Sequence, residues 1–187
     1  MASEISHAVV ALAIGKAIGK SIGWRAVPAR FWWLSVICSV LPDVDVLGFA
    51  LGIEYGDLLG HRGLTHSLCF ALVVSLAVVR MQFPEAALGS QSWWRLIAHF
   101  FLVTASHGFL DAMTNGGLGV AFFSPFDNSR YFLPWRPVEV SPIGLAGFFT
   151  PHGAQVLASE LMWIWIPVGL AALAVGTYRR LASGRFP

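Results

Sequence analysis

Histidine and aspartate side chains, which bind divalent metals, recur together in this chain. His107 and Asp111 are four residues apart. On a helix this spacing puts the two side chains about 40° apart on one face. Both can bind one ion, or Asp111 can orient His107 through a hydrogen bond while His107 alone binds the metal. The pair is also compatible with a plain hydrogen-bonded contact that holds no metal.

A second group stands at the start of an apolar stretch, in the string His61-Arg-Gly-Leu-Thr-His66-Ser. Two residues five apart do not share one face of a regular helix, so we expect His61 in a loop and His66 in the first helical turn. Thr65 or Ser67 is then placed to cap the helix or to hold a ligand. The alternative is two solvated histidines beside Arg62, with no metal.

Two carboxylates form a third group, in which Asp43 and Asp45 follow Pro42 within an apolar run. An unpaired carboxylate in such surroundings is costly, whereas a divalent cation compensates both charges. The alternative is a pair of helix-capping acids at a surface turn. His7 lies near the start of another apolar stretch and by itself is typical of a polar residue at an interface.

Taken together, these groups predict a metal site. Histidine nitrogens with carboxylate oxygens suit Zn²⁺, or Mn²⁺ and Fe²⁺ where carboxylates dominate. The candidate ligands outnumber the four of one tetrahedral ion, so we expect one or two ions. These ligands are His7, Asp43, Asp45, His61, His66, His107 and Asp111. We expect His99 to be buried and hydrogen-bonded instead, and His152 to be a lone loop residue.

The elements that must position these residues are strongly apolar. The chain has 187 residues, of which 56% are hydrophobic and 12% charged. The charged share is about half of the roughly 25% found in soluble domains. The net charge of +2 is too small to indicate a polyanion partner. The composition therefore argues against a soluble enzyme, a disordered protein and a nucleic-acid binder, and it favours an integral membrane protein.

Five stretches reach the length of about 20 residues that a spanning helix needs. They are Ile5–Gly23, Phe31–Gly52, Leu64–Met81, Trp94–Met113 and Val156–Tyr178. The first carries two lysines, so it is either a short span or a tilted amphipathic helix. Residues 114–155 are rich in glycine and proline and predict an extramembrane loop cap. We therefore expect a single all-α domain over residues 1–187, a polytopic integral membrane bundle of about five helices with this cap.

The basic residues predict the orientation of these helices, because Lys and Arg accumulate on the cytoplasmic side. With the C-terminal tail inside and all five stretches spanning, only Arg62, Arg130 and Arg136 lie outside. The basic residues inside are Lys16, Lys20, Arg25, Arg30, Arg80, Arg95, Arg179, Arg180 and Arg185. All seven candidate ligands then lie at outer helix ends. Since this topology used Lys and Arg alone, the convergence of His and Asp is an independent observation.

The motifs resemble those of the YdjM-like family of bacterial inner-membrane proteins, some of them under LexA control. The resemblance rests on His7, Leu41-Pro-Asp-Val-Asp45, His61-Arg-Gly-Leu-Thr-His-Ser67 and His107-x-x-x-Asp111 followed by Thr114. It covers the chain from His7 to about Arg136. It implies a multi-pass protein of the bacterial inner membrane with metal-dependent hydrolase activity.

A looser similarity connects the chain to zinc-dependent phospholipase C and related nucleases. Those all-helical enzymes hold a zinc cluster with His and Asp from several helices, including an H-x-x-x-D pair. The similarity implies that His107 and Asp111 are zinc ligands, with His7, Asp43 and His66 as counterparts of others. No glutamate stands here in a matching H-x-x-x-E position, so the full three-metal arrangement is not expected.

These observations predict a membrane-bound hydrolase in which a metal-activated water attacks an ester or phosphoester. Asp43 or Asp45 is expected to act as general base. Arg62 and Arg130 are expected to bind a phosphate, with which guanidinium pairs bidentately. Because the site meets lipid head groups, the expected substrate is a phospholipid or a lipid-linked phosphate at the periplasmic face.

Two other functions fit the same residues. Intramembrane His and Asp also mark the paths of metal-ion or proton transporters, although here only His99 and Glu160 extend such a path inward. A structural membrane protein stabilised by a metal is the third possibility. Catalytic turnover and an open coordination position would separate the enzyme from the structural protein.

Overall fold

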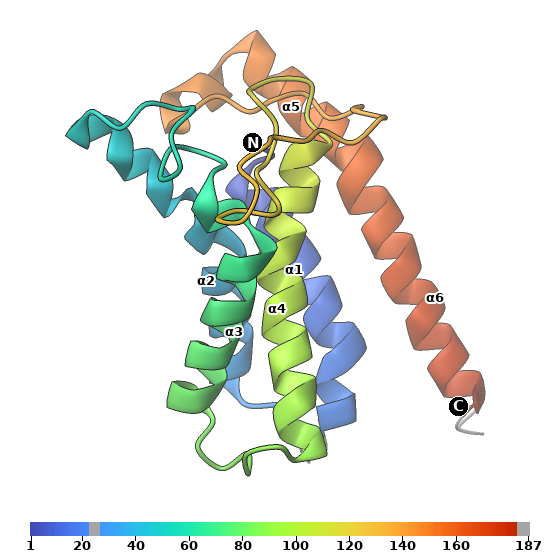
Figure 1. Ribbon diagram of the computed structural model, residues 1–187. Helices are drawn as coiled ribbons and strands as arrows, with labels where there is room; N and C mark the ends of the chain where they lie inside the picture. The colour runs from blue at the N-terminus through green and yellow to red at the C-terminus, as the bar shows by residue number, and fades with distance from the viewer. Residues whose placement is uncertain (23–26, 183–187) are drawn as a thin grey trace.

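The computed structural model describes residues 1–22 and 27–182 (Figure 1). Within these ranges the chain is helical, and its β pairing consists of two isolated bridges in the loops. The prediction of an all-α protein is therefore confirmed for the described residues. Gly23, at the end of the first apolar stretch, and the basic residues Arg25 and Arg185 lie outside these ranges.

Four helices form a bundle, namely α1 (Glu4–Ile18), α2 (Ala29–Val40), α3 (Leu68–Gln82) and α4 (Gln91–Ala112). A short 3-10 turn, η1 (Gly19–Ile22), extends α1. The longest of the four, α4, packs against each of the others. Its buried residues Leu96, Phe100 and Val103 join Phe31 of α2 in the main apolar core. Burial of each such side chain contributes roughly 1.5–3 kcal/mol, so α4 is the fixed element to which the other site-bearing segments are attached.

Serine side chains cap the starts of α1, α3 and α4. The Ser67 hydroxyl accepts a hydrogen bond from the backbone N–H of Phe70, which the first turn of α3 leaves without a helical partner. Of the two caps predicted for this helix, the structure uses Ser67. The helix begins at Leu68 rather than Leu64, because residues Leu64–His66 form a separate 3-10 turn, η3.

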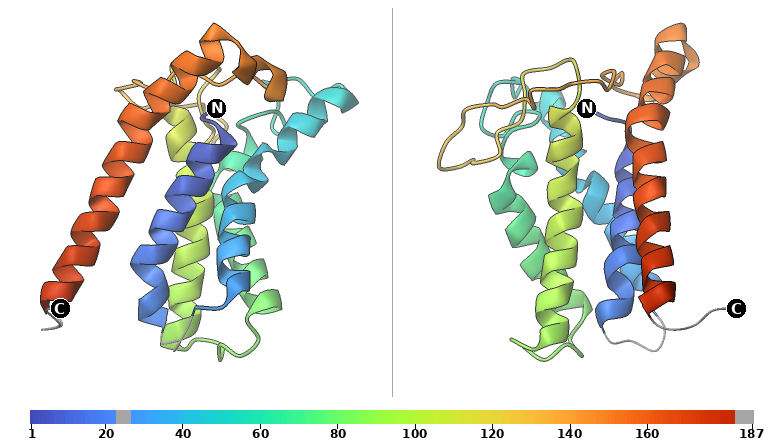
Figure 2. Two further views of the ribbon diagram at one scale, coloured as in Figure 1. Left: turned by 180° about the vertical axis from the view of Figure 1, so that it is seen from behind. Right: turned by 90° about the vertical axis from the view of Figure 1, so that its right-hand side faces the viewer.

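A second long segment runs from α2 directly into η2 (Leu41–Leu51), an extended 3-10 helix. Pro42 is tolerated in the first turn of η2, where its missing N–H would have no helical partner. The segment ends at Gly52, whose φ of 79° is in the left-handed region that favours glycine. η2 leaves the bundle obliquely, as the cyan helix in Figures 1 and 2 shows.

The C-terminal part is another continuous helical segment, formed by α5 (Pro151–Glu160), a π-helical turn, η5 (Leu161–Trp165), and α6 (Ile166–Ala182). α6 packs against α1 on the outside of the bundle (Figure 2). The loop cap ends earlier than predicted, because Thr150 caps α5 and Pro151 occupies its first turn.

Two helical segments are long and apolar enough to cross a bilayer by length and composition, Ala29–Leu51 and Pro151–Ala182. α3 is apolar but shorter. Ala29–Leu51 and Pro151–Ala182 correspond to the second and fifth predicted stretches. The five-span, polytopic arrangement therefore stays a prediction.

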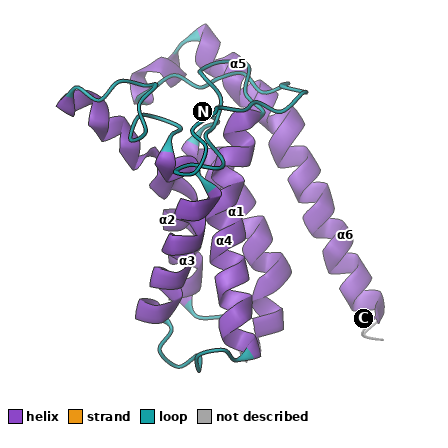
Figure 3. Cartoon of the chain, viewed as in Figure 1, coloured by secondary structure: helices purple, strands orange, loops and turns teal. Residues whose placement is uncertain are grey.

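Loops gather over one end of the bundle (Figure 3). They comprise residues 52–63 and 113–150, the latter with a short 3-10 helix, η4 (Leu145–Phe149). The backbone N–H of Ala121 donates to the carbonyl of Arg62, and that of Ser141 donates to the carbonyl of Met1. These bonds hold both loops and the N-terminal residues together. The N terminus lies at this end, whereas α6 runs to the other (Figure 1).

Candidate metal centre

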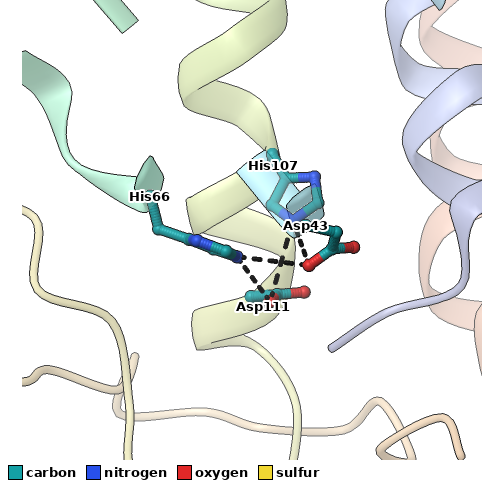
Figure 4. A group of neighbouring side chains, drawn as sticks. All are labelled: Asp43, His66, His107 and Asp111. Atoms are coloured by element: carbon teal, nitrogen blue, oxygen red, sulfur yellow. Dashed lines mark ion pairs between the residues drawn. The ribbon is translucent and has the colours of Figure 1, made fainter. Parts of the chain in front are cut away.

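Four side chains from three segments point toward one another beneath the loops (Figure 4). Asp43 is in the first turn of η2, His66 ends η3, and His107 and Asp111 lie on the last two turns of α4. One nitrogen or oxygen atom from each lies within 4.8 Å of the others. The structure thus brings together residues that are up to 68 positions apart in the sequence, and it confirms that His107 and Asp111 share a helix face.

The spacing of these four atoms is that of a metal's ligand shell. The Nε2 atoms of His107 and His66 lie 3.3 Å and 3.4 Å from Asp43 Oδ1. The same two nitrogens lie 3.9 Å and 3.5 Å from Asp111 Oδ2. Tetrahedral ligands about 2.0–2.2 Å from a zinc ion stand about 3.3–3.6 Å from each other. Three of the four distances fall in this range, and the fourth is slightly longer.

These atoms also lack hydrogen-bond partners. Asp43 Oδ1, His66 Nε2, His107 Nε2 and Asp111 Oδ2 are all buried without one among the described residues. A buried polar atom that makes no bond costs about 1–3 kcal/mol, and an ionised one costs more. Four such atoms facing one point are satisfied together by one cation.

The hydrogen bonds on the far side of each imidazole leave the inward nitrogen free to bind a metal. His107 Nδ1 lies 2.7 Å from the backbone carbonyl oxygen of Ser39. A carbonyl only accepts, so Nδ1 carries the proton and Nε2 offers its lone pair. Asp45 serves His66 in the same way, because its Oδ2 lies 3.1 Å from His66 Nδ1.

Asp45 is the centre of an outer layer of hydrogen bonds. Its Oδ1 lies 2.8 Å from His61 Nδ1, and its Oδ2 accepts from the Thr65 hydroxyl at 2.6 Å and from the Arg62 backbone N–H at 3.2 Å. Asp45, His61 and His66 also have the spacing of a metal-binding group. Their facing atoms are already bonded to one another, however, unlike those of the first group. His61 thus lies in the loop, as predicted, and contacts the centre through carboxylates.

Arg62 lies against Asp111 inside the protein. Its side chain is fully buried, and its Nε lies 3.1 Å from Asp111 Oδ2. Its two terminal nitrogens donate to the Gly116 carbonyl and the Thr114 hydroxyl. Arg62 has a φ of 64°, a left-handed conformation that costs a non-glycine residue about 1–3 kcal/mol. The surrounding bonds hold the residue in this conformation, so its cation is fixed beside Asp111.

His7 lines the centre from α1 without belonging to the four-atom group. Its ring stacks on that of His107, with the centroids 3.7 Å apart and the planes at 11°. Its Nε2 lies 3.5 Å from Asp111 Oδ1, and neither ring nitrogen has a hydrogen-bond partner among the described residues. Asp111 Oδ1 accepts from the backbone N–H of Ala2 at 2.8 Å. The N-terminal residues therefore form one wall of the centre.

Arg130 belongs to the loop cap. Its guanidinium donates to the carbonyls of His61 at 2.8 Å and Tyr55 at 2.9 Å, which ties residues 52–63 to the longer loop. Partial burial lowers the pKa of this guanidinium, while Tyr55 and Asp45 oppose the shift. Arginine nevertheless remains cationic in proteins, so a positive charge stays at the rim of the centre.

The remaining histidines lie away from the centre. His99 is buried in α4, as predicted, and its Nε2 lies 2.8 Å from the Ser35 hydroxyl, whereas its Nδ1 has no hydrogen-bond partner among the described residues. His152 is exposed and bonds the Val140 carbonyl, but it lies in the first turn of α5 rather than in a loop.

The sequence reasoning missed several supporting groups. The Ser39 carbonyl could not be predicted as the partner of His107 Nδ1, because every residue has a backbone carbonyl. The sequence assigns Glu160 only a place on a transporter's ion path, whereas its buried carboxylate accepts from the backbone N–H and hydroxyl of Ser3 and from the hydroxyl of Ser6. Two features of the sequence could have indicated this contact. Ser3 and Ser6 lie at the start of α1, and Glu160 is the one acid of its apolar stretch.

Comparison with known proteins places this site in a family context. The family model of the YdjM inner membrane protein matches residues 1–182. The chain is 40% identical to the inner membrane protein YbcI of Escherichia coli (strain K12) over 185 residues, which is 96% of this chain and 99% of that protein. No solved structure matches. The motifs that carry the resemblance are those whose side chains line the centre, and the chain belongs to the YdjM family of inner membrane proteins.

Proposed function

We propose that this protein is a membrane-bound, metal-dependent hydrolase that cleaves a phosphoester of a phospholipid or lipid-linked substrate. The observation that carries the metal is the set of four buried, unbonded ligand atoms with tetrahedral spacing. The two nitrogens and two carboxylate oxygens suit Zn²⁺, with Mn²⁺ or Fe²⁺ as alternatives.

The charges of the surrounding residues favour one divalent ion over two. Asp43, Asp45 and Asp111 contribute three negative charges, and the buried Arg62 contributes one positive charge. With neutral histidines these four side chains together carry two negative charges, which match the charge of one divalent ion. A second divalent ion would leave two uncompensated positive charges in a buried site, which is costly.

Asp43, His66, His107 and Asp111 would hold this ion, with His7 beside it. Because these four residues would fill a tetrahedral shell, the ion would have to expand to a fifth ligand to accept a water. It would then lower the pKa of that water and polarise a phosphoryl oxygen. Within the chain, Asp45 orients His66, and Arg62 and the Ala2 amide orient Asp111. These contacts fix the geometry of the ligands before any substrate binds.

Asp43 is the best candidate for the general base. Its side chain is 10% exposed, whereas those of His66, His107 and Asp111 are fully buried. Its Oδ2 makes no hydrogen bond among the described residues. A carboxylate oxygen without a hydrogen-bond partner can accept the proton of an attacking water that reaches it. Asp45 is occupied by His61 and Thr65, so its part in the proposal is to position His66.

Arg62 and Arg130 supply the positive potential for a phosphoester. Arg62 is bonded on all sides by protein groups, and Arg130 is bonded to cap carbonyls. In this proposal their fixed charges attract the anionic substrate toward the centre, and a direct clamp on the phosphate would require Arg130 to exchange its carbonyl partners. The proposal places the centre at the periplasmic face of a multi-pass bundle.

Metal analysis of the purified protein tests the first half of the proposal. We expect one divalent ion per chain, lost in His107→Ala and retained in the matched variant His152→Ala. Equal retention of metal in both variants would show that these four residues do not form the site.

Hydrolysis assays with metal-loaded protein in phospholipid vesicles test the second half. We expect release of a water-soluble product that a chelator abolishes. A loaded and folded protein that cleaves no phospholipid or lipid-linked phosphate would refute the hydrolase. Metal flux into proteoliposomes that His107→Ala blocks would then support a transporter, and neither activity would leave a metal-stabilised structural protein.

A further inference from the structure

The α2–η2 segment has an apolar outside and a polar inside. In η2, the buried residues Pro42, Asp45 and Gly48 recur every three positions, which is the repeat of a 3-10 helix. The exposed residues Val44, Leu47 and Ala50 recur with the same period two positions later. Leu47 is 66% exposed, whereas Asp45 is 7% exposed. A helix in water shows the reverse distribution.

Beyond the exposed Arg30 in its first turn, α2 continues into η2 with an outward surface that is apolar. Trp33 and Ile37 are exposed on α2, and Leu51 is exposed at the end of η2. The two acids of η2 are Asp43 and Asp45, and both contact the metal centre. Charged and exposed residues resume after Gly52, with Glu54 and Asp57. The apolar surface of the segment therefore ends at a sharp boundary between Leu51 and Glu54.

The length of the segment fixes the depth of the metal centre. Twelve α-helical residues rise about 18 Å, at about 1.5 Å each. Eleven 3-10 residues add about 22 Å, at about 2.0 Å each. The sum exceeds the hydrocarbon thickness of about 30 Å, and η2 leaves the bundle obliquely (Figure 1). Asp43, the third residue of η2, lies about 23 Å along the segment by the same rises, which is below the far surface.

We infer that η2 lies in the bilayer interface with Val44, Leu47 and Ala50 among the acyl chains, so that the metal centre receives its phosphate ligand from a membrane phospholipid and not from water. The partly exposed Asp43, near the start of η2, is then reached from the lipid along η2. This inference rests on the proposed function for the metal centre, while the position of η2 stands on its own pattern of exposure.

A fluorescent label tests the position of η2 without any activity. In a Cys38→Ala/Cys69→Ala background, an environment-sensitive dye on Leu47→Cys is compared with the same dye on Glu54→Cys, in vesicles that contain phospholipids with a nitroxide on the upper acyl chain. We expect blue-shifted emission and strong quenching at position 47, and neither at position 54. Equal quenching at both positions would overturn the inference.

A charged substitution in η2, made in the protein that keeps both native cysteines, tests whether the phospholipid reaches the centre along η2. Leu47→Lys, which removes little packing, is matched with Leu118→Lys in the cap, where Leu118 is 53% exposed. We expect Leu47→Lys to keep its metal and to cleave a monomeric short-chain phospholipid, but to lose cleavage of the same head group in vesicles. Unchanged vesicle cleavage in Leu47→Lys would refute access along η2. If the unmodified protein cleaves neither form of the lipid, the proposed hydrolase activity is refuted instead. The quenching experiment would still decide the position of η2.

Discussion

At the scale of single residues, we expect the buried pair of Arg62 and Asp111 to couple the stability of the protein to metal binding at the proposed centre. Removing one partner of a buried ion pair costs about 3–5 kcal/mol, because the other charge is left uncompensated. In Arg62→Gln, the uncompensated charge is that of Asp111, which a divalent ion also neutralises. We therefore expect Arg62→Gln to unfold at a much lower temperature without metal and to gain more from added metal than the unmodified protein does.

Thermal unfolding with and without Zn²⁺ measures this difference. Arg136→Gln is the matched control, because Arg136 is exposed and stacks over Phe132, away from the centre. We expect this control to behave like the unmodified protein. A metal-induced shift in Arg62→Gln no larger than that of the control would show that Arg62 does not balance Asp111.

The hydrogen bonds of Asp45 predict an effect on metal affinity without a change in the ligands themselves. Asp45→Asn keeps the size of the side chain but removes its charge and replaces one of its two oxygens, which face His61 and His66 separately, with an amide that cannot accept. Loss of such supporting bonds costs about 10–100-fold in metal affinity. Competition with a metal-binding dye measures the affinity. Asp57→Asn removes an exposed carboxylate that accepts from the Glu54 amide, and equal effects of the two substitutions would contradict the role of Asp45.

At the scale of elements, a carboxylate on α5 fixes the start of α1. Glu160 bonds Ser3 and Ser6, and Ser6 also accepts from the Trp165 indole at 2.7 Å. Hydrogen bonds to a charged group contribute about 1.5–3 kcal/mol each. In Glu160→Gln we expect faster hydrogen exchange at the start of α1 and weaker metal retention, since the Ala2 amide that holds Asp111 adjoins Ser3.

The half-buried Glu139, which accepts from the Asn115 side chain, provides the comparison for Glu160. Glu139→Gln should leave both the exchange rates and the metal content unchanged. If Glu160→Gln also leaves the exchange rates at the start of α1 unchanged, the contact does not fix this helix.

Local spacing predicted the parts of the site that lie within one element, and failed where elements meet. The interval from His107 to Asp111 indicated a shared helix face, and the apolar run around Pro42 indicated that Asp43 and Asp45 need compensation. The stacking of His7 on His107 depends on how α1 packs against α4, which no spacing along the chain encodes. The role of Arg62 depends on a left-handed backbone at a non-glycine residue, which composition does not indicate.

At the scale of the whole molecule, charge and polarity are separated along the bundle axis. The metal centre, the N terminus and the loop cap occupy one end, and the C-terminal end of α6 occupies the other (Figures 1 and 2). Among the described residues, the helix ends remote from the centre include the basic residues Lys16, Arg30, Arg80, Arg95, Arg179 and Arg180. The loop cap has Arg62, Arg130 and Arg136, of which Arg62 is buried as a partner of Asp111.

This separation predicts the orientation of the protein in the membrane. Lys and Arg near helix ends are retained on the cytoplasmic side, so the end remote from the metal centre should be cytoplasmic and the loop cap periplasmic. A fluorescent protein fused after Ala182 should fold and fluoresce, whereas alkaline phosphatase inserted at Asn128 should be active. Both sites avoid the helices, since α6 ends at Ala182 and Asn128 is an exposed loop residue. Fluorescence at Asn128 together with phosphatase activity after Ala182 would reverse the topology and put the metal centre at the cytoplasmic face. Activity of phosphatase at both sites would require an even number of crossings between them, which a single crossing by the Pro151–Ala182 segment cannot provide.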